Sequence, residues 1–503
     1  MSGSIMQASD SPGPRRSAVR DPVLWIILVL SGALKLWLAF SLDSSPSVLD
    51  ERDYLQIAQT LADQGRYPGN FRPPLYPAYM AMMISLGWGT LGMRVGQVIL
   101  STISAVLAYR IAGRMSGTPA ARIAGGLLAF DPVLVMFTHR LWSETLFIVL
   151  LLAALDILSA TAVTRRWWPW ASAGLLLGLA GLTRPVILTF VPLLLPWALL
   201  QMRRAGRMSG AGVQDAKAEQ ANDGEQGSRS PARAGCLRFG LLVLACSAAV
   251  APWTIRNALV HDAFIVVDTN GPFNFLVGSQ PEAAFVDKDS FWSQRFGLVG
   301  GRPYQVVAEQ DAAAAQRMAM QQAWENIKGS PGRFARRCLW EASRLWTLDS
   351  FLLRHLRNGW YGRATAPLFT AMMTLLAAGF FVVLVLAAFA GLATEAASPF
   401  RGLALLLIVH ATILFGITYA LSRYCLPLHA VLAIPAAGML SSFRCRLSRL
   451  KPAGFRVHRV LLLVAVVTIL GWQWAGDLPM VWDMMSNAGA GHLFHMEQFL
   501  SPR

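Results

Sequence analysis

Long apolar stretches recur along this chain and limit what it can fold into. Most are about 17 to 25 residues long, the length that an α-helix needs to cross a hydrocarbon core of about 30 Å. Hydrophobic residues make up 54% of the chain and charged residues only 14%, whereas soluble domains are about 25% charged. This composition excludes a soluble globular enzyme. The sequence therefore predicts an all-α polytopic membrane protein.

Basic residues beside the apolar stretches predict how the helices are oriented, because short loops rich in Lys and Arg stay in the cytoplasm. Arg15, Arg16 and Arg20 precede the first stretch, 22–42, and place the N-terminus inside. If the crossings alternate from there, each short basic loop falls on the inner side, and the count is about 11 transmembrane helices. The net charge of +16 has the same explanation, so no nucleic acid partner is predicted.

Polarity along the chain predicts its division into segments. Residues 201–236 are polar and rich in Gly, Ala and Gln, which is typical of a disordered linker rather than a folded domain. In chain order, the predicted segments are a cytoplasmic tail (1–21), an N-terminal transmembrane catalytic module (22–200) with its first extracytoplasmic loop (43–91), a disordered cytoplasmic linker (201–236), a transmembrane helix (237–254), a long extracytoplasmic loop (255–364), the C-terminal transmembrane helices (365–476) and an extracytoplasmic tail (477–503).

The first loop carries two predicted short helices. Apolar residues recur at i, i+3, i+4 and i+7 from Tyr54 to Leu61, so Glu51–Gln64 is predicted as an amphipathic helix on the membrane surface. Pro73 and Pro74 then begin a second helix, 75–86, which is predicted to lie in the interface. Asp50 stands at the start of the first helix, where an acid is favoured by the helix dipole whether or not it takes part in chemistry.

Six fragments of the sequence stand in a specific order. They are LDERDYLQIAQTLADQG, FRPPLYPAYMAMM, ARIAGGLLAFDPVLVMFTHRLWSETLF, GLAGLTRP, APWTIRNALV and LSRYCLPLHAVLAIP, and they lie within residues 22–440. In this order they resemble the GT-C glycosyltransferases, in the branch of the bacterial aminoarabinose transferases, the protein O-mannosyltransferases and the Rgt-type sugar transferases. The resemblance implies a GT-C-like helical bundle in the inner (plasma) membrane of a bacterium, with the active site on the extracytoplasmic side.

The resemblance also implies a reaction, namely the inverting transfer of a hexose or pentose from a polyprenyl-phosphate donor to a lipid, glycan or protein acceptor. The first acid of the family's DE motif falls on Asp50, and Glu51 is the second acid. The acid of the next outer loop falls on Glu144. The basic residue before the family's proline falls on Arg72. These carboxylates can hold a divalent metal ion or act without one, so no metal site is assigned.

The chemistry of such a transfer suits these residue types. A sugar hydroxyl becomes a good nucleophile when a carboxylate accepts its proton, and Asp50 is predicted as that general base. A departing phosphate is stabilised by guanidinium groups. Arg72, Arg184, Arg423 and Arg256 all lie near predicted outer helix ends and are candidate ligands of the donor phosphate. A single arginine at such a place can instead reach to lipid headgroups, or simply close a helix.

Two alternative functions are also compatible with the sequence. A transporter or flippase of lipid-linked sugars is the main alternative, although transporters usually show paired repeats and ionisable groups near the membrane midplane. The sequence shows no internal repeat, and its candidate acids belong to one surface. A non-catalytic relative that only binds lipid phosphate is the other alternative, which the intact Asp50 and Glu51 pair disfavours.

Overall fold

The computed structural model describes residues 18, 20–42, 49–161, 166–204, 231–280, 298–348, 350–357, 367–394, 398–443 and 457–486. Much of the two predicted tails and of the predicted linker lies outside the described residues, namely 1–17, 205–230 and 487–503.

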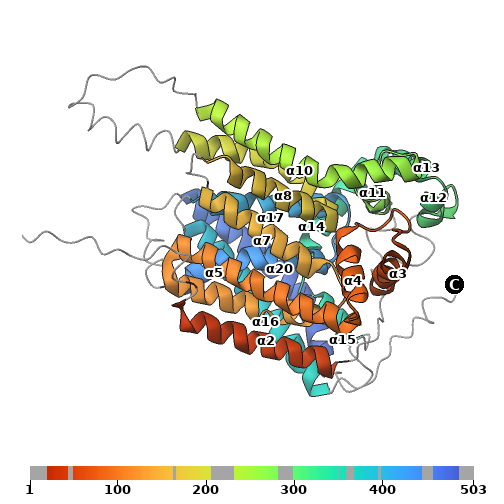
Figure 1. The fold of residues 1–503 in the computed structure, drawn as a ribbon. Coiled ribbons are helices and arrows are strands. Elements are labelled where there is room, and N and C mark those ends of the chain that lie inside the picture. The colour runs from red at the N-terminus through yellow and green to blue at the C-terminus, as the bar shows by residue number, and fades with distance from the viewer. Residues whose placement is uncertain are drawn as a thin grey trace, which may run out of the picture.

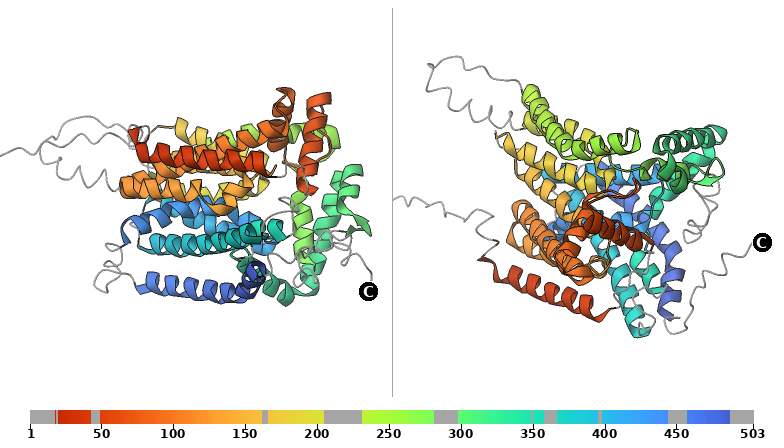
Figure 2. Two further views of the ribbon diagram at one scale, coloured as in Figure 1. Left: turned by 90° about the horizontal axis from the view of Figure 1, so that it is seen from below. Right: turned by 45° about the vertical axis from the view of Figure 1, so that its right-hand side comes forward.

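The described chain forms a bundle of long helices that run side by side (Figures 1 and 2). Large apolar side chains cover the outside of this bundle: Leu244 is 67% exposed and Trp472 is 86% exposed. Such faces are stable in lipid rather than in water. The predicted all-α polytopic membrane protein is confirmed.

Among the described residues, eight stretches are long and apolar enough to span a membrane. They are Pro22–Ser41 (α2), Gly89–Ala129 (α5), Pro185–Arg204, Arg233–His261 within α10 (Pro231–His261), Pro367–Thr394 (α16), Pro399–Ile417 (α17), Ser422–Ser441 (the 3-10 turn η5, Ser422–Cys425, with α18, Leu426–Ser441) and Leu463–Trp482 within α20 (Val457–Ser486).

Three further helical segments, added to these eight stretches, account for the predicted transmembrane helices. Within α5 the chain turns back at Gly117, whose φ of 82° is readily adopted only by glycine. The two halves of α5 then face each other, since a Cβ placed on Gly113 would lie 3.3 Å from the Cβ of Ala121. The other two segments are α7 (Glu144–Thr161) and α8 (Trp168–Thr183), with 18 and 16 residues. Each of the three corresponds to a predicted span.

Short helices gather at one end of the bundle (Figures 1 and 2). Among them are α3 (Leu49–Gln64) and α4 (Leu75–Ser85), which match the two helices predicted in the first loop. The apolar stripe of α3 packs on α4, with Tyr54 and Ala58 buried against Tyr76. The long loop supplies α11 (Asn270–Ser279), the antiparallel strands β1 (Leu298–Val299) and β2 (Arg302–Pro303), α12 (Tyr304–Gln310), α13 (Ala312–Gly329), α14 (Pro331–Arg344) and α15 (Phe351–Arg357).

Basic side chains mark the opposite end of the bundle. Asp156 lies 12 residues beyond the start of α7, or about 18 Å along the helix. Arg110 and Arg114 bind its carboxylate at 2.9 and 2.5 Å. Arg122 binds Asp21 at 2.9 Å. The arginines predicted to orient the helices are therefore grouped away from α3 and α4.

Close packing of α8 on α10 holds the end of α8 in place. A Cβ on Gly174 would lie 2.1 Å from the carbonyl oxygen of Leu242, so only glycine permits this approach. The helix α10 begins at 231, before the predicted 237, and α20 ends at 486, beyond the predicted 476. Hydropathy marks the part of a helix that lies in lipid, whereas backbone hydrogen bonding continues past that part.

Candidate active site

A cavity of about 310 Å³ lies among segments that are far apart in the sequence. One side, here called the arginine wall, consists of Asp50, Arg72, Glu144, Arg184 and Arg423. Another side, here called the α11 wall, consists of Asp268, Asn270, Gly271 and Asn274. The arginine wall thus draws on α3, the loop before α4, the start of α7, the end of α8 and η5.

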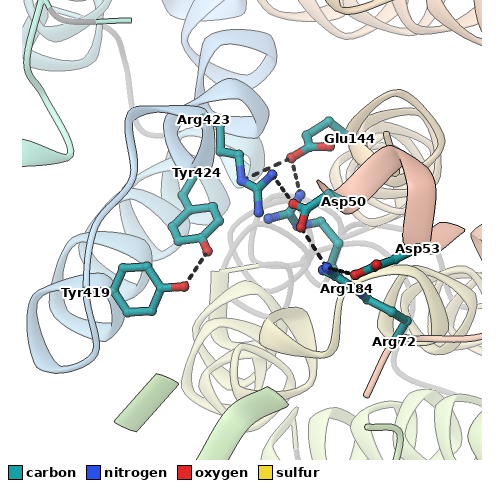
Figure 3. A network of polar contacts seen from close by, with 8 residues as sticks. All are labelled: Asp50, Asp53, Arg72, Glu144, Arg184, Tyr419, Arg423 and Tyr424. Carbon is teal, nitrogen blue, oxygen red and sulfur yellow. Dashed lines mark hydrogen bonds and ion pairs between the residues drawn. The ribbon is translucent and has the colours of Figure 1, made fainter. Parts of the chain in front are cut away.

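Asp50 is the centre of the arginine wall. Its two oxygens each accept a hydrogen bond from a guanidinium group, from Arg72 at 2.6 Å and from Arg423 at 2.6 Å (Figure 3). Burial alone would raise the pKa of the Asp50 carboxyl, but the charges of Arg72 and Arg423 outweigh it and hold that pKa well below its usual range. Asp50 is therefore a carboxylate that is fully engaged by arginines.

Glu144 binds a second pair of guanidinium groups. Arg184 donates a short hydrogen bond to Glu144, and Nε of Arg423 lies 4.0 Å from the same carboxylate oxygen (Figure 3). Arg423 also stacks over Trp142, with its guanidinium carbon 4.8 Å from the ring centre. Arg423 thus links both acids of this wall.

Two arginines of this wall precede proline, and this explains their position. A residue before proline is pushed towards extended backbone, which ends a helix. Arg184 is such a residue: it follows α8, has φ −147° and ψ 103°, and precedes Pro185. Arg72 precedes Pro73, and its backbone oxygen accepts a hydrogen bond from the hydroxyl of Tyr67 at 2.9 Å. The Nε of Arg72 is a buried donor without a hydrogen-bond partner among the described residues.

A clamp from the long loop positions Arg423. In α14, Arg337 donates to the backbone oxygens of Thr418 at 2.6 Å and Ile417 at 2.7 Å. Glu341 accepts from the backbone N–H of Ala420 at 2.8 Å. Arg337 and Glu341 are both buried, and together they fix the chain just before η5. In the sequence, α14 is an amphipathic basic helix, and this pattern does not single out Arg337 or Glu341 as a clamp.

Two predicted site residues, Glu51 and Arg256, do not line the cavity. Glu51 binds Arg140 at 2.6 Å and the N–H of Leu141 at 2.8 Å, with side chains 1 to 2% exposed. Adjacent helical residues differ by about 100° in direction, so Asp50 and Glu51 do not face the same space. Arg256 donates to the backbone oxygen of Tyr67 at 2.7 Å and does not line the cavity.

The α11 wall was not predicted. Asp268 lies just before α11, and one of its oxygens accepts the backbone N–H of Asn270 at 3.2 Å. It makes no ion pair among the described residues. Burial raises the pKa of the Asp268 carboxyl to about 7, against an ordinary value of 3.8. In the sequence, Asp268 stands in VDTNGP, which is typical of a turn and gives no sign of a site.

A second, apolar pocket adjoins the cavity at Arg184. Its volume is about 40 Å³, and it shares Arg184, Val186, Phe415 and Tyr424 with the larger cavity. The rest of its lining comes mainly from apolar residues of α7, α17 and α18. The charged cavity thus continues into an apolar pocket within the bundle.

The arrangement of charges suits an anion better than a metal ion. Asp50 and Glu144 are already neutralised by arginines. In the part of the chain that the structure describes, no group of three or more His, Cys, Asp or Glu side chains is placed to hold a metal ion. Asp50 and Glu144, as arranged, therefore face guanidinium groups rather than a divalent cation.

A family comparison bears on residues 71–211. They match the family model described as dolichyl-phosphate-mannose-protein mannosyltransferase. The predicted resemblance to GT-C glycosyltransferases is confirmed. The matched residues include Arg72, Glu144 and Arg184 of the arginine wall. No curated protein sequence matches the chain.

Solved structures also resemble this fold, all at low identity. The oligosaccharyltransferase AglB from Archaeoglobus fulgidus, in complex with an inhibitory peptide and a dolichol-phosphate, is 13% identical with a TM-score of 0.44, and the match covers 94% of this chain and 56% of that one. ArnT from Cupriavidus metallidurans, bound to undecaprenyl phosphate, is 17% identical with a TM-score of 0.39, covering 84% and 79%. The arabinosyltransferase EmbB from Mycobacterium smegmatis is 16% identical with a TM-score of 0.33, covering 88% and 43%. The chain spans little more than half the length of AglB.

Proposed function

We propose that this protein is a membrane glycosyltransferase that moves a hexose or pentose from a polyprenyl-phosphate donor to an acceptor. One observation carries the proposal: three guanidinium groups from distant segments converge on one cavity at the end of a membrane bundle, beside an apolar pocket. The family match over residues 71–211 supports it.

The donor phosphate is proposed to bind to Arg72, Arg184 and Arg423. Guanidinium groups can grip a phosphate through parallel hydrogen bonds, and they neutralise the charge that builds up on a leaving phosphate. The unpartnered Nε of Arg72 is a ready donor for such a contact. The apolar pocket beside Arg184 is then proposed to take the first isoprene units.

The transfer itself is proposed as a single displacement. The acceptor oxygen attacks the anomeric carbon while the bond from that carbon to the phosphate oxygen breaks, which inverts the anomeric centre. Asp50 stays a prediction as the general base. For that role one of its oxygens must leave a guanidinium group, which a phosphate bound to Arg72 or Arg423 would bring about.

The acceptor and the location are also part of the proposal. The acceptor is a lipid, glycan or protein, and the cavity faces the extracytoplasmic side of a bacterial inner membrane. The grouping of Arg110, Arg114 and Arg122 at the opposite end of the bundle supports this orientation. Labelling of Arg302→Cys with a membrane-impermeant maleimide in spheroplasts tests it, because Arg302 is exposed at the cavity end.

A transporter of lipid-linked sugars is the second candidate. The observation that favours it is a set of ionisable groups inside the bundle, where Lys35 donates to Ser101 at 2.9 Å and His429 pairs with Asp131 at 2.7 Å. Such buried groups occur on ion and proton pathways in membrane proteins.

Donor consumption in detergent separates the two candidates. Purified protein in micelles is given undecaprenyl-phosphate hexoses and pentoses with lipid and glycan extracts, and the release of undecaprenyl phosphate is followed by mass spectrometry. We expect release from one donor, with a matching mass gain in one acceptor. Micelles have no compartments to cross, so the absence of any release, together with donor translocation in proteoliposomes, would replace the transferase by the transporter.

A further inference from the structure

The two walls of the cavity differ in how their acids are engaged. Both acids of the arginine wall contact guanidinium groups, and Asp50 has each oxygen at 2.6 Å from one of them. Asp268 of the α11 wall has only backbone N–H groups as partners among the described residues. The cavity therefore contains one carboxylate that is free to bind a hydroxyl.

The backbone beside Asp268 is firmly held. The N–H of Thr269 donates to the backbone oxygen of Asn70 at 2.9 Å, and its hydroxyl donates to the Asn70 side chain at 3.1 Å. Tyr304 of α12 donates to the backbone oxygen of Thr269 at 2.8 Å. Asn70 lies two residues before Arg72, so these bonds fix Asp268 relative to the arginine wall. A catalytic group needs such preorganised support.

We propose that Asp268 is the general base that accepts the proton of the attacking acceptor hydroxyl. This inference rests on the proposed function and departs from the prediction for Asp50. As the acceptor oxygen bonds to the anomeric carbon, its proton passes to the carboxylate of Asp268, and the bonding electrons of the carbon–phosphate-oxygen bond leave with the polyprenyl phosphate. The proton then returns to water.

The acidity of the two carboxyls agrees with this division. A general base works best when its pKa lies near the working pH. Burial brings the pKa of Asp268 to about 7, and the charge of Arg72 limits that rise. Tyr67 and Tyr304 are the other titratable groups that face it. The pKa of Asp50, in contrast, is held well below its usual range by two arginines, so Asp50 is a weak base.

The test compares Asp268→Asn with Asp50→Asn. An asparagine at 268 can still accept the N–H of Asn270, so the turn before α11 is kept while the base is removed. We expect transfer by Asp268→Asn to fall by about 10²–10⁴-fold, with undecaprenyl phosphate binding within about twofold of wild type. In the wild type, the transfer rate should fall as the pH drops below the pKa of Asp268, which gives the pH profile an acidic limb. The residual activity of Asp268→Asn should lack this limb. Asp268→Glu should recover part of the rate, with a shifted limb.

The outcomes separate this inference from the proposed function. If Asp268→Asn transfers sugar at the wild-type rate and keeps the acidic limb of the pH profile, while Arg423→Ala is strongly impaired in the same assay, the inference is overturned and the proposed function stands. If the acidic limb of the pH profile is lost in Asp50→Asn instead, Asp50 is the general base. No donor consumption by wild-type protein would overturn both. If Asp268→Asn does not fold, Asp268→Glu is measured in its place. An acidic limb at the same pH as in the wild type would then overturn the inference.

Discussion

The arginine wall and the α11 wall line one cavity but differ in whether their carboxylates are paired with guanidinium groups. In the arginine wall, the charges of Asp50 and Glu144 are compensated within the protein, and the guanidinium groups are preorganised for an incoming anion. In the α11 wall, Asp268 makes no ion pair among the described residues, and burial raises its pKa. The comparison teaches that acids on one cavity can serve different steps: the paired ones orient cations and the unpaired one can take a proton.

Within the arginine wall, the largest expected effect is that of Arg423→Ala on transfer. Loss of a group that stabilises developing charge typically costs about 10²–10³-fold in rate, and Arg423 also holds Asp50 and Glu144 in place. We expect kcat to fall by about this factor, measured by donor consumption. The acidic limb that depends on Asp268 should remain in the residual rate. A changed limb would show that the two walls do not act separately. Arg302→Ala, an exposed arginine near the same end, is the control.

The clamp from α14 should affect the arginine wall alone. Glu341→Ala frees the backbone N–H of Ala420 and leaves Arg337 without its neighbouring carboxylate, so η5 and Arg423 lose their support. We expect a loss of about 10-fold in kcat/KM, in the range of misplaced catalytic groups, with the acidic limb unchanged. Steady-state kinetics across pH measure both. An unchanged kcat/KM would mean that η5 is held by other contacts.

The apolar pocket should bind the lipid chain and not the phosphate. Leu407→Trp places a larger ring in this pocket. We expect undecaprenyl phosphate to bind about 10-fold more weakly, since lost burial of one or two methylene groups costs about 0.8 kcal/mol each. Binding of a short-chain phosphate should stay unchanged. Equal affinities for both ligands would place the chain elsewhere.

The smallest expected effect concerns stability and pH. Because the pKa of Asp268 is raised to about 7 from 3.8, the folded protein binds a proton between these values that the unfolded chain does not. Stability is therefore lost as the pH rises through this window. Asp268→Asn should melt above wild type at about pH 8 and equal to it near pH 4, as followed by thermal unfolding in detergent. A difference that is independent of pH would contradict a shifted pKa.

Much of the fold was predictable from the sequence. Apolar length gave the spanning helices, and the apolar spacing from Tyr54 to Leu61 gave α3 within two residues. The turn at Gly117 was predictable only as a return through the membrane, because a long helix and a helical hairpin have the same hydropathy. Hydropathy did not mark helix ends such as Pro231 and Ser486, because helix propensity continues beyond the apolar residues.

The candidate site was predictable in part. Arg72 and Arg184 stand before prolines, and Asp50 begins a surface helix, so local pattern indicated exposed helix ends. Which of these ends meet is decided by tertiary packing, and for that reason Arg256 was expected in the cavity and Asp268 was not. Glu51 shows the same limit, since its partner Arg140 is 89 residues away.

We propose above all that the arginine wall binds a polyprenyl phosphate headgroup. This proposal is tested most directly by the affinity of purified protein in nanodiscs for undecaprenyl phosphate, measured for wild type, Arg302→Ala and the double variant Arg72→Ala/Arg423→Ala. Hydrogen bonds to charged groups contribute about 1.5–3 kcal/mol each, so we expect the double variant to bind at least about 10-fold more weakly, and Arg302→Ala to bind as wild type does. Equal affinity in all three proteins would contradict the proposal.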